Sequence, residues 1–441
     1  MALTLHVGID DTDSMQGGCT TYVAALLVER LSKLGVEFLD YPNLIRLNPN
    51  IPWKTRGNGA IALRIKVEPQ LVDRIRSEVL RTVEENSQLG IEYVDPAVVF
   101  LTGPVPEEVK ALSRRALYDV VDVGYALEVA GRCGMEVFAY GDFRGVVGAM
   151  AAVGEELTGD HTYELLTYRV VEYRGKPRMV SEESVAEMDR ATRPRTFDNL
   201  DPETGRVLIT PRGPDPVLYG IRGEDPYTLL KAMKIVKVGE PIERWVIFRS
   251  NQGTDSHLRW IDEPDEVKPY RAVAFRAVVY SKPYTIPGGH VIFKVSFKGE
   301  VFDCAAYEPT GGFRDIARKL IPGDVVEVYG GVRPLDSGLT VNLEKLRIVE
   351  LAKKVEYRNP KCPKCLSTMK SMGRGKGFRC RKCGFRDPKA RKLEVELPRD
   401  VKPGLYIPPP RAHRHLTKPY SRYGQEKKGM RYGFVEPWHI P

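Results

Sequence analysis

An acidic loop between two apolar segments most constrains the fold of this chain. Residues 3–9 form an apolar run typical of a strand, and from residue 22 to 34 apolar positions recur at helical spacing. Asp10, Asp11 and Asp13 lie between these segments and are followed by two glycines and two threonines. A strand, a polar loop and a helix in this order predict an α/β unit with its ligand site at the carboxyl end of the strand.

The chemistry of this loop suits a nucleotide. A helix N-terminus offers unpaired N–H groups to an anion, and carboxylates are the ligands that hold Mg²⁺ beside a triphosphate. The loop lacks the Gly-Lys-Ser/Thr sequence of a Walker motif. The alternative is that its polar residues only form turns and cap the helix. We predict a nucleotide and Mg²⁺ site formed by Gly8, Asp10, Asp11, Thr12, Asp13, Gly17, Gly18 and Thr20.

A basic loop at residues 47–60 follows the next predicted strand. Lys54 and Arg56, with Arg46 just before the loop, are candidates to neutralise phosphate opposite the acidic loop. The alternative is a solvated turn whose charges are incidental. The whole pattern predicts one α/β domain over residues 1–143. Its further elements are expected as strands at 38–47, 60–67 and 95–102 and helices at 69–86 and 106–121.

Residues 144–262 predict a second domain of mixed strands and helices. The expected helices are 145–157, 181–192 and 226–236, and the expected strands are 163–171, 207–210 and 244–248. This mixture favours a compact α+β sandwich, of which the ferredoxin-like arrangement is one recurrent form. His257 follows the last strand and is expected to be a hydrogen-bonded structural residue.

Residues 263–352 predict an OB-fold β-barrel. The expected strands are 270–280, 290–298, 300–306, 324–333 and 339–346, with a helix at 312–320 between the third and the fourth. This order is typical of the OB-fold. Tyr270, Phe275, Phe293, Lys294 and Lys298 offer stacking and charge to a single strand. The alternative is that these aromatic residues belong to the barrel core.

Two Cys-x-x-Cys pairs predict a zinc ribbon at residues 353–389. Fourteen residues separate the pair Cys362 and Cys365 from the pair Cys380 and Cys383, which lets four thiolates close a tetrahedron around Zn²⁺. Four protein ligands leave no open position, so we expect a structural zinc. Disulfides are the alternative, and a reducing cytoplasm disfavours them.

Positive charge is concentrated in the C-terminal part of the chain. Residues 353–431 contain 24 Lys+Arg against six Asp+Glu, whereas the remainder contains 43 against 52. This asymmetry is typical of a nucleic-acid binder, so the basic C-terminal region is expected to contact RNA together with the OB-fold. The tail at residues 390–441 is rich in proline and tyrosine and lacks periodicity. We expect it to be extended and to become ordered on RNA or against the body.

Length and hydropathy narrow the class of protein further. The 441 residues favour three or four domains, and we expect a multidomain α+β protein. No run of 18 apolar residues and no secretion signal are present, so a cytoplasmic protein without a membrane span is expected. These features predict a nucleotide-using enzyme that binds nucleic acid. The alternative is a non-enzymatic single-strand binder, for which the acidic loop would have no use.

Several separate segments resemble, in the same order, those of the archaeal tRNA-isoleucine 2-agmatinylcytidine synthetase (TiaS) family. The resemblance spans roughly residues 3–385 and does not obviously include the tail. It is carried by residues 8–13 (GIDDTD), 18–21 (GCTT), 46–49 (RLNP), 54–60 (KTRGNGA), 148–154, 196–199 (TFDN) and 217–223 (VLYGIRG).

The resemblance implies an ATP-dependent tRNA-modifying ligase. Members attach agmatine to carbon 2 of the wobble cytidine of the tRNA-isoleucine with a CAU anticodon, which lets that tRNA read AUA. ATP is split to AMP and phosphates, and a kinase-like first domain phosphorylates the cytidine 2-oxygen. The ferredoxin-like domain contributes to the agmatine site, while the OB-fold and zinc ribbon bind the tRNA.

The resemblance also implies roles for single residues. A threonine of the first loop becomes autophosphorylated in the family, and Thr20 occupies that position here. Agmatine is a dication that needs carboxylates, for which Asp198 and Asp215 are candidates; the alternative is that both only form turns or caps. The implied catalytic residues are Asp10, Asp11, Asp13, Thr20, Lys54 and Arg56.

Overall fold

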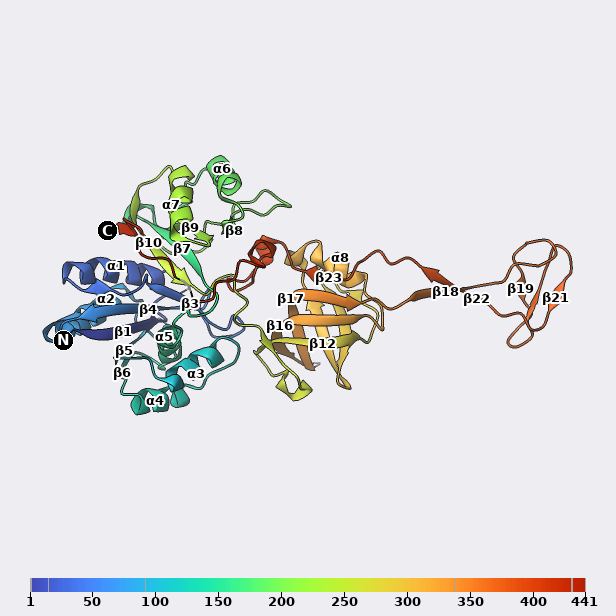
Figure 1. Cartoon of the computed structure of the whole chain (residues 1–441), viewed down its shortest axis with the longest axis horizontal. Coiled ribbons are helices and arrows are strands. Elements are labelled where there is room, and N and C mark those ends of the chain that lie inside the picture. Colours follow the sequence, from blue (N-terminus) through green and yellow to red (C-terminus); the bar gives the residue numbers. More distant parts are fainter. Residues whose placement is uncertain (1, 15, 92, 337, 430, 441) are drawn as a thin grey trace.

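The computed structural model describes residues 2–14, 16–91, 93–336, 338–429 and 431–440, so Met15 of the acidic loop lies outside the described residues. The molecule is an elongated multidomain α+β protein (Figure 1). A large body carries both chain ends, a β-barrel lies beside it, and a small ribbon projects from the barrel at the far end. Within the described part of the chain, no helix is long and apolar enough to cross a membrane.

One 11-stranded sheet runs through the whole body. Its main path is β6-β5-β1-β4-β3-β10-β7-β9-β8, with β2 on β4 and β24 on β10. The strands are β1 (Leu3–Asp10), β2 (Glu37–Phe38), β3 (Asn43–Arg46), β4 (Gly59–Val67), β5 (Ala97–Thr102), β6 (Glu136–Ala139), β7 (Thr162–Arg169), β8 (Thr196–Phe197), β9 (Val217–Gly223), β10 (Ile242–Ser250) and β24 (His439–Ile440).

The two domains expected from the sequence share this sheet. Strand β3 of the first pairs in parallel with β10 of the second, Asn43 opposite Arg249 and Leu44 opposite Ser250. The Ser250 hydroxyl also donates to the Leu44 carbonyl at 2.6 Å. The two units therefore form one continuous platform.

Helices cover both faces of the sheet and enclose two apolar cores. Helices α1, α2, α6 and α7 share one core with the odd-numbered residues of β1, and α3, α4 and α5 share the other. The helices are α1 (Thr20–Lys33), α2 (Val72–Asn86), α3 (Glu107–Ala116), α4 (Val123–Arg132), α5 (Gly145–Gly154), α6 (Glu182–Thr192) and α7 (Pro226–Ile235). Helix α5, expected in the second unit, packs on β1, β4 and α3 of the first.

Several predicted elements of the body differ from those observed. The single strand expected at 38–47 is two short strands, β2 and β3, separated by a turn in which the Asp40 carboxylate accepts from the Tyr41 amide. The helix expected at 106–121 ends at Ala116, and α4 follows it. No strand forms at 207–210, where Val207 makes only an isolated bridge to Leu200.

A closed barrel follows the body. Its strands run β12-β16-β17-β15-β14, and β14 returns to β12 through the pairs Val278–Ser296 and Val279–Val295. The elements are β11 (Arg259–Trp260), β12 (Ala272–Val279), β13 (Tyr284–Thr285), β14 (Val291–Phe297), β15 (Glu300–Ala306), α8 (Phe313–Arg318), β16 (Val325–Leu335) and β17 (Gly338–Glu350). Phe275 and Phe293 are fully buried in its core, so neither offers a stacking surface.

The ribbon stands on a two-stranded stalk formed by β18 (Lys354–Arg358) and β22 (Leu393–Leu397). Its tip contains β19 (Lys370–Ser371), β20 (Phe378–Arg379) and β21 (Arg386–Asp387). Among the described residues, the buried core of the tip consists of Cys362, Met369, Phe378 and Cys380, and Cys365, Phe385 and Ala390 pack against it half-buried. So small a core needs a metal to hold its fold.

The tail returns from the ribbon and is ordered against the barrel and the body. Strand β23 (Gly404–Tyr406) pairs with β17, and β24 pairs with β10 at the opposite end of the molecule. Figure 1 shows this segment, in red, crossing from the barrel to the body. Arg422 is fully buried between Asp160 and Glu224. The tail is therefore part of the folded protein.

Candidate active site

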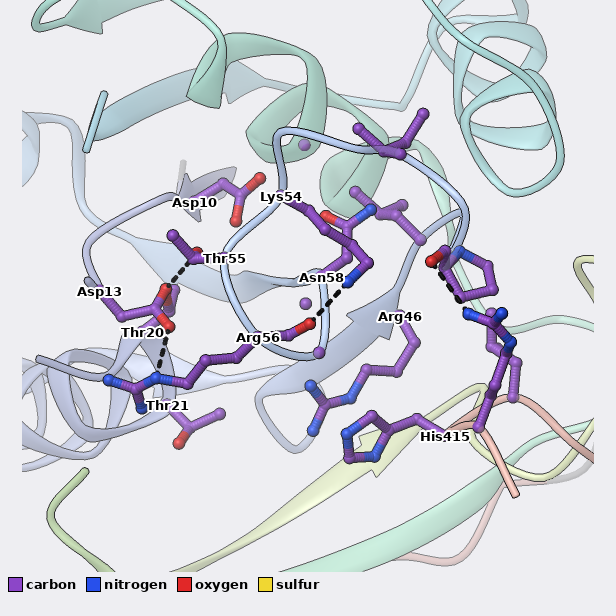
Figure 2. Close-up of a pocket in the computed structure, with 18 of the residues that line it drawn as sticks. Asp10, Asp13, Thr20, Thr21, Arg46, Lys54, Thr55, Arg56, Asn58 and His415 are labelled. Carbon is purple, nitrogen blue, oxygen red and sulfur yellow. Dashed lines mark hydrogen bonds and ion pairs between the residues drawn. The ribbon is translucent and has the colours of Figure 1, made fainter. Parts of the chain in front are cut away.

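One cavity of about 1080 Å³ opens where four parts of the body meet. The acidic loop, the basic loop, the β7–β9 region and the tail all line it. Figure 2 shows Asp10, Asp13 and Thr20 on one side, with Lys54, Arg56 and Arg46 beside them and His415 beyond. The volume exceeds that of a typical single-ligand pocket, so the cavity has room for more than one small molecule.

The acidic loop begins at the carboxyl end of β1, as the sequence predicts. Asp10 is the last residue of that strand. Asp11 follows with φ +58° and accepts a hydrogen bond from the Asp95 amide at 3.1 Å. Burial, then repulsion from Asp11 and Asp13, raises the pKa of Asp10 well above its usual value. Burial likewise raises the pKa of Asp11 to about 6. A cation in the cavity would stabilise the ionised forms.

A glycine of α5 makes room for Asp10. A Cβ atom on Gly148 would lie 1.7 Å from Asp10 Oδ2. Helix α5 also approaches β1 closely at Gly8, where a Cβ would lie 2.2 Å from the Ala149 carbonyl oxygen. These two glycines let the helix lie directly against the strand that ends in the acidic loop.

The basic loop is locked onto the acidic loop by Arg56. Its guanidinium donates to the carbonyls of Ser14, Gly17 and Gly18 at 2.8, 2.9 and 3.0 Å and lies 3.5 Å from Asp13. Arg56 has φ +40°, which is rare for a residue with a long side chain. Arg56 therefore acts first as a brace between the loops.

Thr20 is the first residue of α1 and lines the cavity. Its hydroxyl accepts a hydrogen bond from Thr12 at 3.1 Å, and both side chains are buried. The N-terminal turn of α1 therefore presents a hydroxyl group to the cavity beside the acidic loop.

Lys54 and Arg46 place positive charge in the centre of the cavity. The Lys54 ammonium donates to the Arg56 carbonyl at 2.9 Å and has no carboxylate partner among the described residues. Arg46 is 3.9 Å from Glu164, and within the described part of the chain no acceptor contacts its buried Nε. Both cations are available to an anionic ligand.

The two carboxylates predicted for agmatine line the cavity but already have partners. Asp198 lies 3.1 Å from the Nδ1 atom of His413 in the tail. Asp215 pairs with Arg178 at 3.3 Å and with Arg56 at 3.4 Å. An incoming dication would have to displace these side chains from the two carboxylates.

Four of the predicted nucleotide-binding residues do not line the cavity: Gly8, Thr12, Gly17 and Gly18. Gly8 lies within β1 against α5, and Thr12 supports the Thr20 hydroxyl. Gly18 has φ +76°, a conformation that favours glycine, and its carbonyl accepts from Arg56. In this structure Thr12, Gly17 and Gly18 shape the loop and Gly8 permits the packing of α5, and their contact with a nucleotide stays a prediction.

The sequence did not reveal the contribution of the tail to this cavity. His415 accepts a hydrogen bond from Arg222 at 2.7 Å through Nδ1. Burial and the neighbouring cations Arg46, Arg222 and Lys54 hold its pKa well below 6.5, so the ring is neutral. Only the His-x-His spacing at 413–415, in an otherwise extended segment, marked these residues in the sequence.

The four predicted zinc ligands come together in the ribbon. The Sγ atoms of Cys362, Cys365, Cys380 and Cys383 all lie within 4.8 Å of one another. Sulfur atoms bound to one Zn²⁺ at about 2.3 Å lie about 3.8 Å apart, so the cluster fits a tetrahedral zinc site. All four cysteines are free thiols, which excludes the disulfide alternative in this structure.

Comparison with known proteins identifies the family. Models described as the TiaS TCKD domain, the TiaS FLD domain and the TiaS C-terminal zinc ribbon domain match residues 6–142, 144–257 and 359–401. The tRNA-isoleucine 2-agmatinylcytidine synthetase TiaS of Staphylothermus marinus is 45% identical over 439 residues, which cover 96% of this chain and 94% of that relative. The chain belongs to the TiaS family. Because the alignment covers 96% of the chain, the TiaS likeness extends into the tail, contrary to our expectation.

Solved TiaS structures have the same overall architecture. The complex of a TiaS with its isoleucine tRNA and ATP is 42% identical with a TM-score of 0.86. The complex with the isoleucine tRNA, AMPCPP and agmatine is 41% identical with a TM-score of 0.84. Each comparison covers 95% of this chain and 97% of the other.

Proposed function

We propose that this protein is a tRNA-isoleucine 2-agmatinylcytidine synthetase, which joins agmatine to carbon 2 of the wobble cytidine in an ATP-dependent reaction. The observation that carries the proposal is the convergence of carboxylates, a helix-opening threonine and the cationic side chains of Lys54, Arg46 and Arg56 in one cavity of about 1080 Å³. Membership of the TiaS family supplies the substrates, because the related structures contain an isoleucine tRNA, ATP or its analogue, and agmatine.

The reaction requires that the 2-oxygen of the cytosine ring first be converted into a leaving group. In the proposed sequence the cytidine 2-oxygen attacks the γ-phosphorus of ATP and displaces ADP. The agmatine amine then adds to carbon 2 and loses a proton, and the C2–O bond breaks as phosphate leaves. Transfer of the next phosphoryl group from ADP to the Thr20 hydroxyl breaks the second anhydride bond and leaves AMP, and water then releases the phosphate from Thr20. Lys54 and Arg46 stabilise negative charge on the transferring phosphate, while Arg56 holds the two loops together. Thr20 is positioned to accept phosphate in the family's autophosphorylation.

Mg²⁺ fits the acidic loop as a partner of ATP. The three loop carboxylates do not form a complete ion site, since among the described residues only the four cysteines gather closely enough for that. Mg²⁺ is usually held by one or two carboxylates together with phosphate oxygens. Asp10, Asp11 and Asp13 would supply those carboxylates, and the bound ion would neutralise the developing charge on phosphate. Burial raises the pKa of all three, and a bound cation would lower it again.

Agmatine binding is proposed at Asp198 and Asp215, which come from the second unit of the shared sheet. Both carboxylates line the cavity; Asp215 is paired with Arg56, and Asp198 contacts the His413 ring. A dication would take the place of these partners. Trapping of agmatine between these carboxylates and the phosphorylated base would orient its amine.

The remaining parts are proposed to bind the tRNA in a cytoplasmic enzyme. Residues 1–143 would form the kinase-like domain and 144–262 the ferredoxin-like domain, on their shared sheet. The barrel at 263–352 would act as an OB-fold, and residues 353–389 as the zinc ribbon, while the tail at 390–441 would complete both the body and the RNA surface.

The decisive experiment measures AMP release from labelled ATP with Mg²⁺, agmatine and a tRNA-isoleucine transcript, each omitted in turn. We expect AMP only with the full mixture, together with a tRNA product whose mass has increased by the agmatine group. Asp11→Ala and Thr20→Val should abolish the product. Thr102→Val, a matched change on an exposed strand end outside the cavity, should leave it unchanged. Absence of ATP turnover with intact RNA binding would instead support the non-enzymatic single-strand binder.

A further inference from the structure

Between the cavity and the barrel lies a surface that we call the junction patch: Trp53, Lys54, Tyr270, Arg333 and Arg414. Trp53 and Lys54 belong to the basic loop, Tyr270 and Arg333 to the barrel, and Arg414 to the tail. Trp53, Lys54 and Arg414 also line the cavity. The junction patch therefore extends without interruption from the barrel surface into the cavity that contains the acidic loop.

The aromatic half of the patch pairs the exposed Trp53 with the half-buried Tyr270, whose backbone is held by hydrogen bonds. Trp53 is 44% exposed, although its ring lines the cavity. The Tyr270 ring meets it edge-on with 6.4 Å between centroids. Tyr270 is fixed on both sides, because its amide donates to Val332 at 2.8 Å and its carbonyl accepts from Asn48 at 2.8 Å. A planar group can thus stack on the exposed Trp53 ring while the Tyr270 backbone stays in place.

The cationic half of the patch lacks enough carboxylates to balance it. Lys54 and Arg333 have no ion pair within the described part of the chain, and the Arg333 guanidinium lies 5.8 Å from the Tyr270 ring centre. Arg414 pairs with Glu344 at 3.1 Å, but Glu344 also binds His257 at 2.8 Å. Burial, followed by the charge of Arg414, lowers the pKa of both Lys54 and Arg333. An anion would relieve this repulsion.

The combination of an exposed aromatic plate with unpaired cations selects the occupant. Single-stranded nucleic acid supplies both an unstacked base and a phosphate chain, whereas an acidic peptide would leave Trp53 unused. A dication such as agmatine is repelled here. Resting on the function proposed above, we propose that the junction patch binds the single-stranded RNA next to the target cytidine. One base stacks on Trp53, and phosphates contact Arg333, Arg414 and Lys54.

The test uses the full chain and a labelled stem-loop RNA that carries the CAU loop, with fluorescence anisotropy as the readout. Trp53→Ala should weaken binding about tenfold, and Trp53→Phe should restore most of it. Arg333→Ala should weaken binding and reduce the salt slope by about one. Tyr227→Ala, an exposed aromatic change on α7 away from the cavity, should have no effect. ATP affinity should be unchanged in Arg333→Ala.

Four outcomes separate this inference from the proposed function. Equal RNA affinity in wild type, Trp53→Ala and Arg333→Ala, with wild type forming product, would overturn the inference alone. Trp53-dependent RNA binding without any product would support the inference and overturn the function. Binding of poly-glutamate as tight as that of RNA, and independent of Trp53, would identify a peptide surface instead. Loss of RNA affinity in Trp53→Ala with rescue by Trp53→Phe supports the stacking platform.

Discussion

Gly148 sets the position of Asp10. A Cβ at residue 148 would lie 1.7 Å from Asp10 Oδ2, and the close contact of α5 with β1 at Gly8 keeps the helix from moving away, so the carboxylate has to shift. We predict that Gly148→Ala displaces Asp10 and lowers the rate of AMP release at least about tenfold, the effect of about 1.4 kcal/mol on a barrier. The rate and the thermal unfolding curve measured together check this.

The matched control is Gly131→Ala. Gly131 lies in α4 and would place its Cβ in open space. This change should leave the rate unaltered and stabilise the helix by up to about 1 kcal/mol. Full activity of Gly148→Ala would show that Asp10 is not needed where the structure places it.

His6 makes stability depend on pH. It is buried, accepts from Arg64 at 3.0 Å and donates to the Gly103 carbonyl at 3.0 Å. Burial and the Arg64 charge lower its pKa from 6.5 to about 4. Between these values the unfolded chain binds a proton that the folded protein does not, so the free energy of unfolding falls as pH drops from about 6.5 to about 4.

His6→Gln should reduce this loss, since glutamine can form similar hydrogen bonds without titrating. We predict that between pH 7 and pH 4.5 the variant loses about 2 kcal/mol less than wild type. Urea unfolding at the two pH values measures the difference. An equal loss in both proteins would contradict the assignment of this proton to His6.

Among the larger elements, the tail is fixed to the body in part by a fully buried arginine. Arg422 donates to Glu224, Asp160 and the Gly253 carbonyl, and its side chain is fully buried. Arg422→Ala would leave Glu224 to Lys427 alone and Asp160 to the Lys427 amide and to Lys418 at 4.0 Å, and the expected cost is about 3 kcal/mol. We predict lower stability in urea and faster proteolysis within residues 404–440.

Arg132→Ala provides the comparison, because its ion pair with Glu108 lies on an exposed helix surface. It should change neither stability nor proteolysis measurably. Normal protection of the tail in Arg422→Ala would mean that β23 and β24 suffice to hold it.

In the molecule as a whole, the zinc ribbon is a separable arm. Lys354 and Leu397 face each other at the base of the stalk, so residues 355–396 can be replaced by a short glycine link. The deleted segment carries 13 Lys+Arg against four Asp+Glu. We predict weaker tRNA binding with a smaller salt slope, and unchanged ATP affinity, because the cavity is formed elsewhere.

Cys380→Ser tests whether the zinc ribbon binds tRNA through its positive charge or through its zinc-dependent fold. It keeps every positive charge but removes one zinc ligand, and metal analysis should show loss of zinc. Cys133→Ser, which changes a thiol of the body outside the cluster, should retain the metal. If Cys380→Ser binds tRNA as wild type does, the arm acts by charge and not by shape.

Features whose residues are close together in the chain could be predicted from the sequence alone. Cys-x-x-Cys pairs bind one ion because short turns bring neighbouring thiolates together, and this needs no distant contact. The acidic loop likewise follows from the strand and the helix that flank it directly. The barrel strands were predictable because their alternation is local, whereas the residue pairs through which β12 and β14 close the barrel were not.

Only the tertiary structure shows which segments, far apart in the chain, line the same cavity. The pairing of β3 with β10 joins residues far apart in the chain, Asn43 with Arg249, and such pairing depends on the packing of both sheet faces. Gly8 was predicted as part of the nucleotide site, and only the structure shows that its lack of a Cβ permits the close approach of α5. The tail carried no periodic signal, yet buried ion pairs and two short strand pairings place His415 beside Arg46. These contacts form between groups that no local pattern connects, so they arise only when the whole chain has folded.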